Sequence, residues 1–265
     1  MRALPLLVAT DLDGTIVRGD GTISERTVAA FTRVEAAGAR FVLVTGRPPR
    51  VMAPIAAAFG HRGTAICSNG ALTYDMRSET VITGRLIAPA DLAAAARALR
   101  AAVPGIGIGC EYPDGQAADD AFEAISFDAG ISIPRPGDEE LFGRPAAKLL
   151  GRHLGYSPDE LLALAAPVLG GLVSVSHSNG THLIEATAVG VSKATAVAEV
   201  AARYAAGPES VLAFGDMPND LPLMSWAGMS CAVANAHPDV LAAATRVIGS
   251  NDADGVARYL EELYA

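Results

Sequence analysis

Two aspartates that end a short apolar segment, Asp11 and Asp13, have the clearest potential for chemistry in this sequence. The segment itself, residues 6–9, predicts a strand buried on both faces, because parallel sheets are built from continuous apolar runs. In open α/β sheets, ligands bind beyond the carboxyl ends of the strands. Two carboxylates held this close together need a cation between them, or one must keep its proton. An ordinary Asp-Gly turn is the alternative interpretation.

Polar residues also follow two later apolar segments, 39–44 and 211–214, which predict further buried strands. We expect these polar groups to meet the first two aspartates at one edge of the sheet. In the second group, the side chains at 219 or 220 could cap a helix predicted over 221–226, and this role is compatible with a role in the site. The residues concerned are Thr45, Gly46, Arg47, Asp216, Asn219 and Asp220.

Lys193 lies in the first turn of a predicted helix that ends at Tyr204 and has Ser192 as its N-cap. A lysine at this position opposes the helix dipole, so it indicates that an anion is bound nearby. An exposed lysine is the alternative. A P-loop is excluded, because no glycine directly precedes the lysine.

The order of the predicted elements favours a doubly wound, mainly parallel α/β sheet. Strands and helices alternate at the start of the chain, and the same alternation resumes after residue 190. The first group has strands at 6–9, 39–44 and 65–68, a helix that begins at Ser24, and a helix from Pro48 through Phe59. The second group has strands at 211–214, 231–234 and 247–248, and helices at 193–204, 221–226, 238–245 and 255–263.

Between these two groups the pattern is mixed and predicts an inserted α+β domain. The predicted boundaries are 1–84 for the first part of the core, 85–186 for the insertion and 187–265 for the second part. A hairpin is expected across Asn179, where Asn-Gly is a turn signal, and the glycine-rich run 105–109 predicts a turn. The other predicted elements are strands at 80–87, 124–127 and 147–150, and helices at 89–103 and 157–169.

Composition excludes several classes of protein. The chain of 265 residues carries a net charge of -9, which argues against a nucleic-acid surface. No apolar run approaches the length of about 18 residues that a membrane span needs, and no signal sequence precedes Asp11, so a cytoplasmic location is expected. Three scattered cysteines, without a Cys-x-x-Cys pair, predict buried free thiols.

Four separated segments resemble, in order, the four motifs of the haloacid dehalogenase (HAD) superfamily. Other segments, at 68–71, 190–193, 235–238 and 250–257, resemble its Cof-type phosphatases. The resemblance covers the two core parts, whereas the inserted domain matches only in position and approximate composition. The four motif segments are 11–15, 45–47, Lys193 and 215–220.

This resemblance implies a phosphatase that hydrolyses a small phosphorylated metabolite through an aspartyl-phosphate. It implies Asp11 as the nucleophile and Asp13 as the acid for the leaving alcohol, kept neutral by the charge of its neighbour. Mg²⁺ is the implied cofactor, held by Asp11, the Asp13 backbone carbonyl and Asp216, with Asp220 orienting a ligand. The implied phosphoryl-binding groups are Thr45, the Gly46 amide, Lys193 and Asn219.

The resemblance also implies that the inserted domain closes over the site as a cap and reads the rest of the substrate. Pockets use few polar groups, so we expect two or three of the candidates to touch the ligand. A metal site on the two histidines of this region is disfavoured, because no third ligand lies at suitable spacing. The candidates are Glu111, Tyr112, Asp114, His177, Asn179, His182 and Glu185.

Two other functions are compatible with the same residues. A phosphomutase or phosphotransferase would share every core residue and would return the phosphoryl group to a bound sugar instead of passing it to water. A non-catalytic regulator that binds a phospholigand would keep the pocket without turnover. The presence of both Asp11 and Asp13 argues against the regulator, because such a protein needs neither carboxylate.

Overall fold

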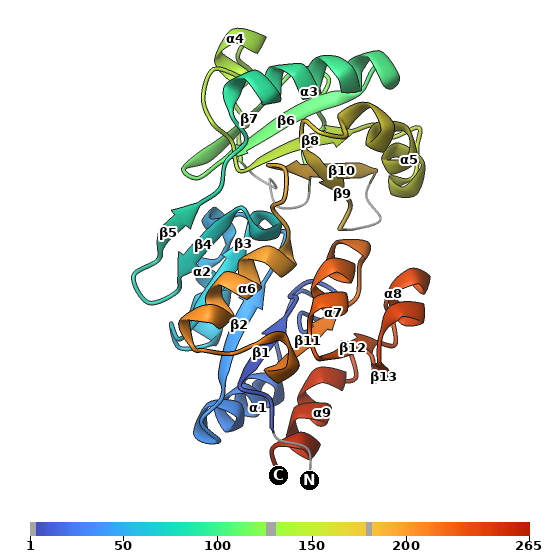
Figure 1. The fold of residues 1–265 in the computed structure, drawn as a ribbon. Coiled ribbons are helices and arrows are strands. Elements are labelled where there is room, and N and C mark those ends of the chain that lie inside the picture. The colour runs from blue at the N-terminus through green and yellow to red at the C-terminus, as the bar shows by residue number, and fades with distance from the viewer. Residues whose placement is uncertain (1–3, 126–130, 179–181) are drawn as a thin grey trace.

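The computed structural model describes residues 4–125, 131–178 and 182–265 and contains two β-sheets, one in each of two domains (Figure 1). The larger sheet is formed by β1 (Leu7–Thr10), β2 (Arg40–Val44), β3 (Thr64–Cys67), β4 (Leu72–Asp75), β5 (Thr80–Gly84), β11 (Val211–Gly215), β12 (Met229–Val233) and β13 (Arg246–Ile248). Its strand order is β13-β12-β11-β1-β2-β3-β4-β5. All neighbours from β13 to β3 are parallel, and β4 and β5 are antiparallel. The predicted doubly wound, mainly parallel sheet is confirmed.

The order of the strands reverses at β1, which lies between β2 and β11. Thr10, the last residue of β1, is in register with Leu43 of β2 and Phe214 of β11. The three carboxyl ends are therefore level with one another. Asp11 follows directly at the point where open α/β sheets form their ligand crevice.

Helices cover both faces of this sheet (Figure 1). Along β1, Val8 packs on one face, whereas Leu7 and Ala9 pack on the other, as the alternation of side chains in a strand requires. The first face is covered by α1 (Glu25–Ala36), α2 (Ala53–Ala58), α8 (Pro238–Ala243) and α9 (Gly255–Leu263). The second face is covered by α6 (Lys193–Arg203) and α7 (Leu221–Trp226).

The smaller sheet is antiparallel, and helices pack against it to form a separate apolar core. Its strands are β6 (Gly107–Tyr112), β7 (Gly115–Ala118), β8 (Lys148–Arg152), β9 (Ser174–Ser176) and β10 (Leu183–Thr187), in the order β7-β6-β8-β10-β9. The helices are α3 (Pro89–Ala102), α4 (Asp138–Leu141) and α5 (Pro158–Leu169). The region has the mixed α+β character expected of the insertion, and the domain boundaries stay a prediction.

Three predictions about turns and strands are wrong. The run 105–109 is not only a turn, because Gly107 begins β6. A Cβ atom there would lie 2.3 Å from Cα of Phe122, so the glycine lets two backbones approach within the smaller domain. Ala124 and Ile125 are outside any strand, and the rest of that predicted strand lies outside the described residues. Leu6 is 51% exposed and precedes β1.

The helix predicted from Pro48 through Phe59 is in fact two shorter elements. A 3₁₀ turn, η1 (Pro49–Val51), is followed by α2, which has Pro54 in its first turn. A proline has no backbone N–H and fits the first turn of a helix, where no intrahelical acceptor is needed. Pro54 therefore lies in the first turn of a new helix instead of continuing the preceding one.

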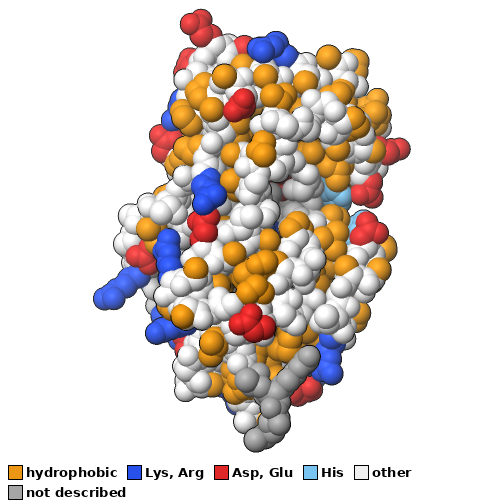
Figure 2. Space-filling view, in the orientation of Figure 1, with side chains coloured by type: hydrophobic (Ala, Val, Ile, Leu, Met, Phe, Trp, Pro, Cys, Tyr) orange, Lys and Arg blue, Asp and Glu red, His pale blue; other side chains and the backbone are white. Residues whose placement is uncertain are grey.

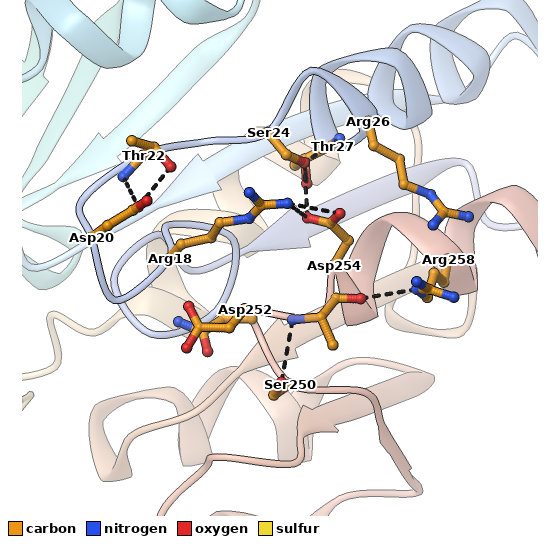
Figure 3. A network of polar contacts seen from close by, with 12 residues as sticks. Arg18, Asp20, Thr22, Ser24, Arg26, Thr27, Ser250, Asp252, Asp254 and Arg258 are labelled. Atoms are coloured by element: carbon orange, nitrogen blue, oxygen red, sulfur yellow. Dashed lines mark hydrogen bonds and ion pairs between the residues drawn. The ribbon is translucent and has the colours of Figure 1, made fainter.

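A network of polar contacts joins the start of α9 to the start of α1 (Figure 3). The Arg18 guanidinium donates to both carboxylate oxygens of Asp254, at 2.8 and 2.9 Å. Ser24 donates to the same carboxylate at 2.8 Å and accepts the amide of Thr27, which caps α1. The segment before the last helix is thereby fixed to the segment that follows Asp13.

Within the described ranges, no helix is both long and apolar enough to cross a membrane. The three cysteines, Cys67, Cys110 and Cys231, are buried and free, as predicted.

Candidate active site at the edge of the larger sheet

Lys193 lies at the centre of the charged groups at this edge. Its ammonium group is 2.6 Å from Oδ1 of Asp11 and 2.7 Å from Oδ1 of Asp220, and the side chain is buried. Ser192 caps α6 by accepting the amide of Thr195, which places the lysine in the first turn. Burial opposes the charge, but the two carboxylates outweigh it and raise the pKa of Lys193 above its usual value. The alternative of an exposed lysine is wrong.

Asp220 holds this lysine and its own loop at the same time. Its Oδ1 atom accepts from Lys193, and its Oδ2 atom accepts the amides of Asp216 and Met217 at 3.0 and 3.1 Å. The side chain makes no capping hydrogen bond to α7, so the predicted capping role is wrong for Asp220. Both of its oxygens are engaged, which suits a residue that orients its neighbours.

Asp11 and Asp216 are the other two members of the buried acidic cluster that contains Asp220. One ligand atom from each of Asp11, Asp216 and Asp220 lies within 4.8 Å of the others. Burial raises the pKa of Asp11 well above its usual value, and Lys193 offsets this only in part. Burial, followed by the charge of Asp220, raises the pKa of Asp216 to about 7.

This donor set fits a hard divalent cation. Carboxylate oxygens are the ligands that Mg²⁺ prefers, and a bound cation would remove the electrostatic cost of ionising two buried carboxylates. Asp220 already has partners on both oxygens, so Asp11 and Asp216 are the pair left to share the cation. Thr15 fixes Asp216 by donating its hydroxyl to Oδ1 at 2.7 Å.

Asp13 faces Arg47, a residue that the sequence analysis placed at this edge without a specific partner. The guanidinium contacts Oδ1 through Nη2 at 2.5 Å and Oδ2 through Nε at 2.8 Å, which is a bidentate ion pair. The Asp13 side chain remains 43% exposed. A cation from the loop after β2 therefore holds the Asp13 carboxyl group in place.

Thr45 and Gly46 form the turn that follows β2. Thr45 is fully buried, and its hydroxyl oxygen accepts the amide of Arg47 at 3.0 Å. This bond leaves the hydroxyl hydrogen of Thr45 able to donate to a ligand. The Gly46 carbonyl accepts a hydrogen bond from Lys148 of β8 at 2.8 Å. A residue of the smaller domain thus contacts the loop expected to bind phosphate.

Three side chains form a hydrogen-bonded row between the two domains. Glu185 of β10 accepts from Nδ2 of Asn69 at 3.0 Å, and Oδ1 of Asn69 accepts from Nδ2 of Asn219 at 3.0 Å. All three side chains are buried. Burial opposes the charge of Glu185, but Lys148 outweighs it and holds the pKa of Glu185 below its usual value.

Lys148 is a residue that the sequence analysis missed. Its ammonium group is 2.5 Å from Glu185 and 3.0 Å from Glu111, and the side chain is buried. A signal for it does exist in the sequence. Of the 20 basic residues, only Lys148 and Lys193 are lysines, and the others are arginines. In a chain that otherwise uses arginine, a lysine in an apolar segment indicates a buried charge with a specific partner.

These groups surround a pocket of about 50 Å³, which we call the central pocket. It joins the edge of the larger sheet to the smaller domain. Its polar lining consists of Asp11, Asp13, Gly46, Arg47, Lys148, Ser178, Glu185 and Asn219.

The candidates from the smaller domain have different positions. Glu185 lines the central pocket, and Glu111 reaches it through Lys148. The Tyr112 hydroxyl donates to the Leu141 carbonyl, and Nδ1 of His182 contacts the Tyr156 carbonyl. Neither is among the described residues that line the central pocket.

The other three candidates also lie away from this pocket or cannot be placed. His177 contacts Asp159 at 2.8 Å, and Asp114 forms an exposed ion pair with Arg144 at 3.0 Å. Asn179 lies outside the described residues.

Comparisons with known proteins identify the family of the chain. The sequence profile of the haloacid dehalogenase-like hydrolases matches residues 8–108 and 136–260. The chain is 25% identical to the 5-amino-6-(5-phospho-D-ribitylamino)uracil phosphatase YitU of Bacillus subtilis, over 100% of both chains. It is 28% identical to the phosphoglycolate phosphatase of Halorubrum lacusprofundi, over 97% of this chain and 96% of the relative. It is 26% identical to the pyridoxal phosphate phosphatase YbhA of Escherichia coli, over 96% and 97%.

Solved structures show the same fold. The phosphatase BT1666 from Bacteroides thetaiotaomicron superposes with a TM-score of 0.82 at 24% identity, over 98% of this chain and 95% of that one. The sugar phosphatase BT4131 superposes with a TM-score of 0.81 at 20% identity, over 97% and 98%. The profile match over most of the chain confirms the resemblance of the motifs, and the protein belongs to the haloacid dehalogenase-like hydrolases.

Proposed function

We propose that the protein, a phosphatase of the haloacid dehalogenase-like family, cleaves a small phosphomonoester through an aspartyl-phosphate formed on Asp11. The observation that carries this proposal is a buried carboxylate at the switch point of the sheet, 2.6 Å from the ammonium group of Lys193. Relatives that match over nearly their whole length are named as phosphatases for a ribitylamino-uracil phosphate, phosphoglycolate and pyridoxal phosphate. These names support a small phosphorylated metabolite as the class of substrate.

In the first step, a carboxylate oxygen of Asp11 attacks phosphorus, and the bond from phosphorus to the alcohol oxygen breaks. Asp13 donates a proton to the departing alcohol. In the second step, Asp13 accepts a proton from water as the water attacks the aspartyl-phosphate, which releases inorganic phosphate and restores Asp11. The Asp13 side chain is 43% exposed, so it can exchange protons with solvent between turnovers.

The phosphoryl group needs donors around its oxygens, because its charge is spread over them in the transition state. The Thr45 hydroxyl, the Gly46 amide, Lys193 and the Asn219 amide group are the donors we assign to this role. Loss of one such donor is expected to cost about 3 kcal/mol of transition-state stabilisation.

Mg²⁺ fits the acidic pair described above, and Asp11, Asp216 and the backbone carbonyl of Asp13 would hold it. The ion would supply positive charge against the phosphoryl oxygens. Asp220 would keep Lys193 and the Asp216 loop in position through its three hydrogen bonds.

The test is release of inorganic phosphate from a panel of phosphorylated metabolites, with Mg²⁺ and with a chelator. We expect release only with the metal, and a loss of at least about a thousandfold in Asp11→Asn. Asp20→Asn is the matched control, because its carboxylate is exposed and accepts hydrogen bonds from Thr22 within its own turn. Full activity in Asp11→Asn would contradict the proposal, and phosphoryl transfer to a sugar without phosphate release would identify a phosphomutase.

A further inference from the structure

Two segments outside the four motifs, 235–238 and 250–257, contact the turn that carries Asp13. We call this turn, residues 12–17, the acid turn. The Leu12 carbonyl closes it by accepting three amides of the turn at 2.8–3.2 Å. The other carbonyl groups of such a compact turn need partners from elsewhere in the chain.

Asn235 supplies one of these partners. Its Nδ2 atom donates to the Gly14 carbonyl at 2.8 Å, and its Oδ1 atom accepts the backbone amide of Asn251 at 3.0 Å. A carbonyl only accepts hydrogen bonds and an N–H group only donates them, so the two partners fix the orientation of the Asn235 amide group. The bond to Gly14 therefore holds the backbone one residue after Asp13.

Asn251 supplies the second partner, at the end of the acid turn. Its Nδ2 atom donates to the Val17 carbonyl at 2.9 Å, and the residue is buried. Its backbone amide is bonded to Asn235 at the same time. The bonds that run from Gly14 through the two asparagines to Val17 therefore connect both ends of the acid turn.

The segment that carries Asn235 also holds Asp216. The amide of His237 donates to the Asp216 carbonyl at 2.8 Å. Gly14 lies close against the Asp216 side chain, since a Cβ atom on this glycine would be 2.3 Å from Oδ2. A displacement of the acid turn would therefore change its placement relative to the Asp216 carboxylate.

Segment 235–238 extends from the acid turn to the boundary between the two domains. The ring centroid of His237 is 6.1 Å from that of His177 in the smaller domain. Figure 2 shows histidine atoms, in pale blue, beside the hollow where the two halves of the molecule meet. The segment lies beside the site, but none of its residues is among the described residues that line the central pocket.

We propose that Asn235 and Asn251 are positioning residues, which hold the acid turn so that the Asp13 carboxyl group can reach the oxygen of the departing alcohol. The inference rests on the proposed function, in which Asp13 gives a proton to this oxygen. Proton transfer requires the donor within hydrogen-bond distance, and a small displacement of a reacting group is costly. The two asparagines act only through the backbone of the acid turn.

The experiment compares two phosphate esters that differ in their need for an acid. One is the alkyl ester of the metabolite panel that the wild type cleaves fastest, and the other is p-nitrophenyl phosphate. An alkoxide must be protonated as it leaves, whereas p-nitrophenolate leaves readily without a proton. Because kcat/KM covers the steps up to cleavage of the ester bond, the ratio of the alkyl to the aryl value measures the contribution of the acid.

Asn235→Ala and Asn251→Ala should each lower this ratio at least about tenfold, mainly through kcat for the alkyl ester. Asp13→Asn removes the acid itself and should lower the ratio at least about a hundredfold. Asp252→Ala is the matched control, because Asp252 accepts the Gly19 amide at 2.9 Å and joins the same two parts of the chain beyond the acid turn. It should change the ratio by less than about twofold.

Thermal melting identifies a variant that fails to fold, and the other asparagine variant then decides. An unchanged ratio in a folded asparagine variant, including an equal loss for both esters, would overturn the inference alone. So would an equal fall of the ratio in Asp252→Ala. If Asp13→Asn leaves the ratio unchanged, or if the wild type releases phosphate from no ester with Mg²⁺, the proposed function itself is rejected.

Discussion

At the scale of single residues, Lys148 determines the charge balance between the two domains. It forms ion pairs with two buried glutamates, Glu111 and Glu185, and its third contact is the Gly46 carbonyl. Arg50 approaches Glu111 at 3.4 Å from the other side. Removal of one partner from such a group leaves a buried charge uncompensated, which is far more costly than removal of the whole group.

Lys148→Met is therefore expected to lower the free energy of unfolding by about 3–5 kcal/mol, and to lower kcat because the Gly46 turn loses its anchor. Adding Glu185→Gln to this variant should recover part of the stability, since one uncompensated charge is then removed. Urea denaturation and phosphate-release kinetics measure both effects. Arg85→Met, which breaks an exposed ion pair with Glu199, is the control and should change stability by less than about 1 kcal/mol. Equal free energies of unfolding for Lys148→Met and Arg85→Met would contradict the assigned role of Lys148.

Residues at the ends of the core strands could be placed from sequence because their position follows from the topology of a parallel sheet. Asp11, Asp216 and Lys193 are brought together by the alignment of β1 and β11 and by the start of α6. Lys148 could not be placed in this way, because its partners come from the pairing of β6, β8 and β10. The strand-pairing register of an antiparallel insertion is set by tertiary packing, which leaves no motif in the sequence.

At the scale of elements, the turn η2 (Ser68–Gly70) sets the position of the start of α6. Gly70 has a φ of +105°, and a Cβ atom on it would lie 2.2 Å from the Ser192 carbonyl oxygen. This contact places the turn after β3 directly against the N-cap that precedes Lys193. A side chain at Gly70 would displace the start of α6, which carries Lys193.

Gly70→Ala is expected to destabilise the protein by at least about 2 kcal/mol more than a glycine replacement that adds backbone strain alone, and to lower kcat. Gly21→Ala is the matched control. Its φ is +83°, and no described atom lies within 4 Å of the added Cβ, so a cost of about 1 kcal/mol from backbone strain is expected. Thermal melting and kcat are the measurements. Equal behaviour of the two variants would show that the contact with Ser192 does not position the helix.

The link between α1 and α9 gives a pH-dependent contribution to stability. Partial burial opposes ionisation of Asp254, but hydrogen bonds from Arg18 and Ser24 outweigh it and hold its pKa below the usual value. The unfolded state therefore binds a proton on Asp254 more readily than the folded state does. The contribution of Asp254 to the free energy of unfolding is complete above about pH 4, and it is lost as the pH falls through the pKa of Asp254 in the folded state.

Asp254→Asn should therefore lower the free energy of unfolding by about 1 kcal/mol at pH 7, and the difference from wild type should shrink below about pH 4. Urea denaturation at several pH values measures this difference. Asp114→Asn, in an exposed ion pair, is the control and should show little difference at any pH. A constant effect of Asp254→Asn from pH 7 to pH 3 would exclude the ion pair as its cause.

Elements with strong local signals were predicted closely, and elements defined by long-range contacts were not. α5 begins one residue after its cap Ser157, and α9 has the predicted bounds, because caps and apolar periodicity are local. β6 and β7 were missed, since their glycine and alanine residues give no strand signal. Gly107 and Gly109 of β6 instead leave room for Phe122, which packs closely against them.

At the scale of the whole molecule, the two domains have separate apolar cores. Leu161 of α5 is fully buried in the core of the smaller domain, and Phe31 of α1 is fully buried in that of the larger one. The single tryptophan, Trp226, lies in α7. Its fluorescence therefore reports unfolding of the larger domain, whereas far-ultraviolet circular dichroism reports both domains.

We expect Leu161→Ala to destabilise the smaller domain by about 3 kcal/mol and to separate the two transitions in urea. The dichroism signal should begin to fall at a lower urea concentration, while the fluorescence transition of Trp226 stays near its wild-type midpoint. Phe31→Ala is the reciprocal control. It should destabilise the larger domain and lower the urea midpoint of the fluorescence transition. Coincident transitions in Leu161→Ala would mean that the two domains unfold as one cooperative unit.

The enclosure of both lysines has a practical consequence for work on this protein. Lys148 and Lys193 are 2% and 1% exposed, so reagents that acylate primary amines should spare both side chains while the molecule is closed. Acylation of Lys148, followed by mass spectrometry, should therefore measure how often the interface between the domains opens, with no engineered label. Its rate should fall when a ligand keeps the molecule shut.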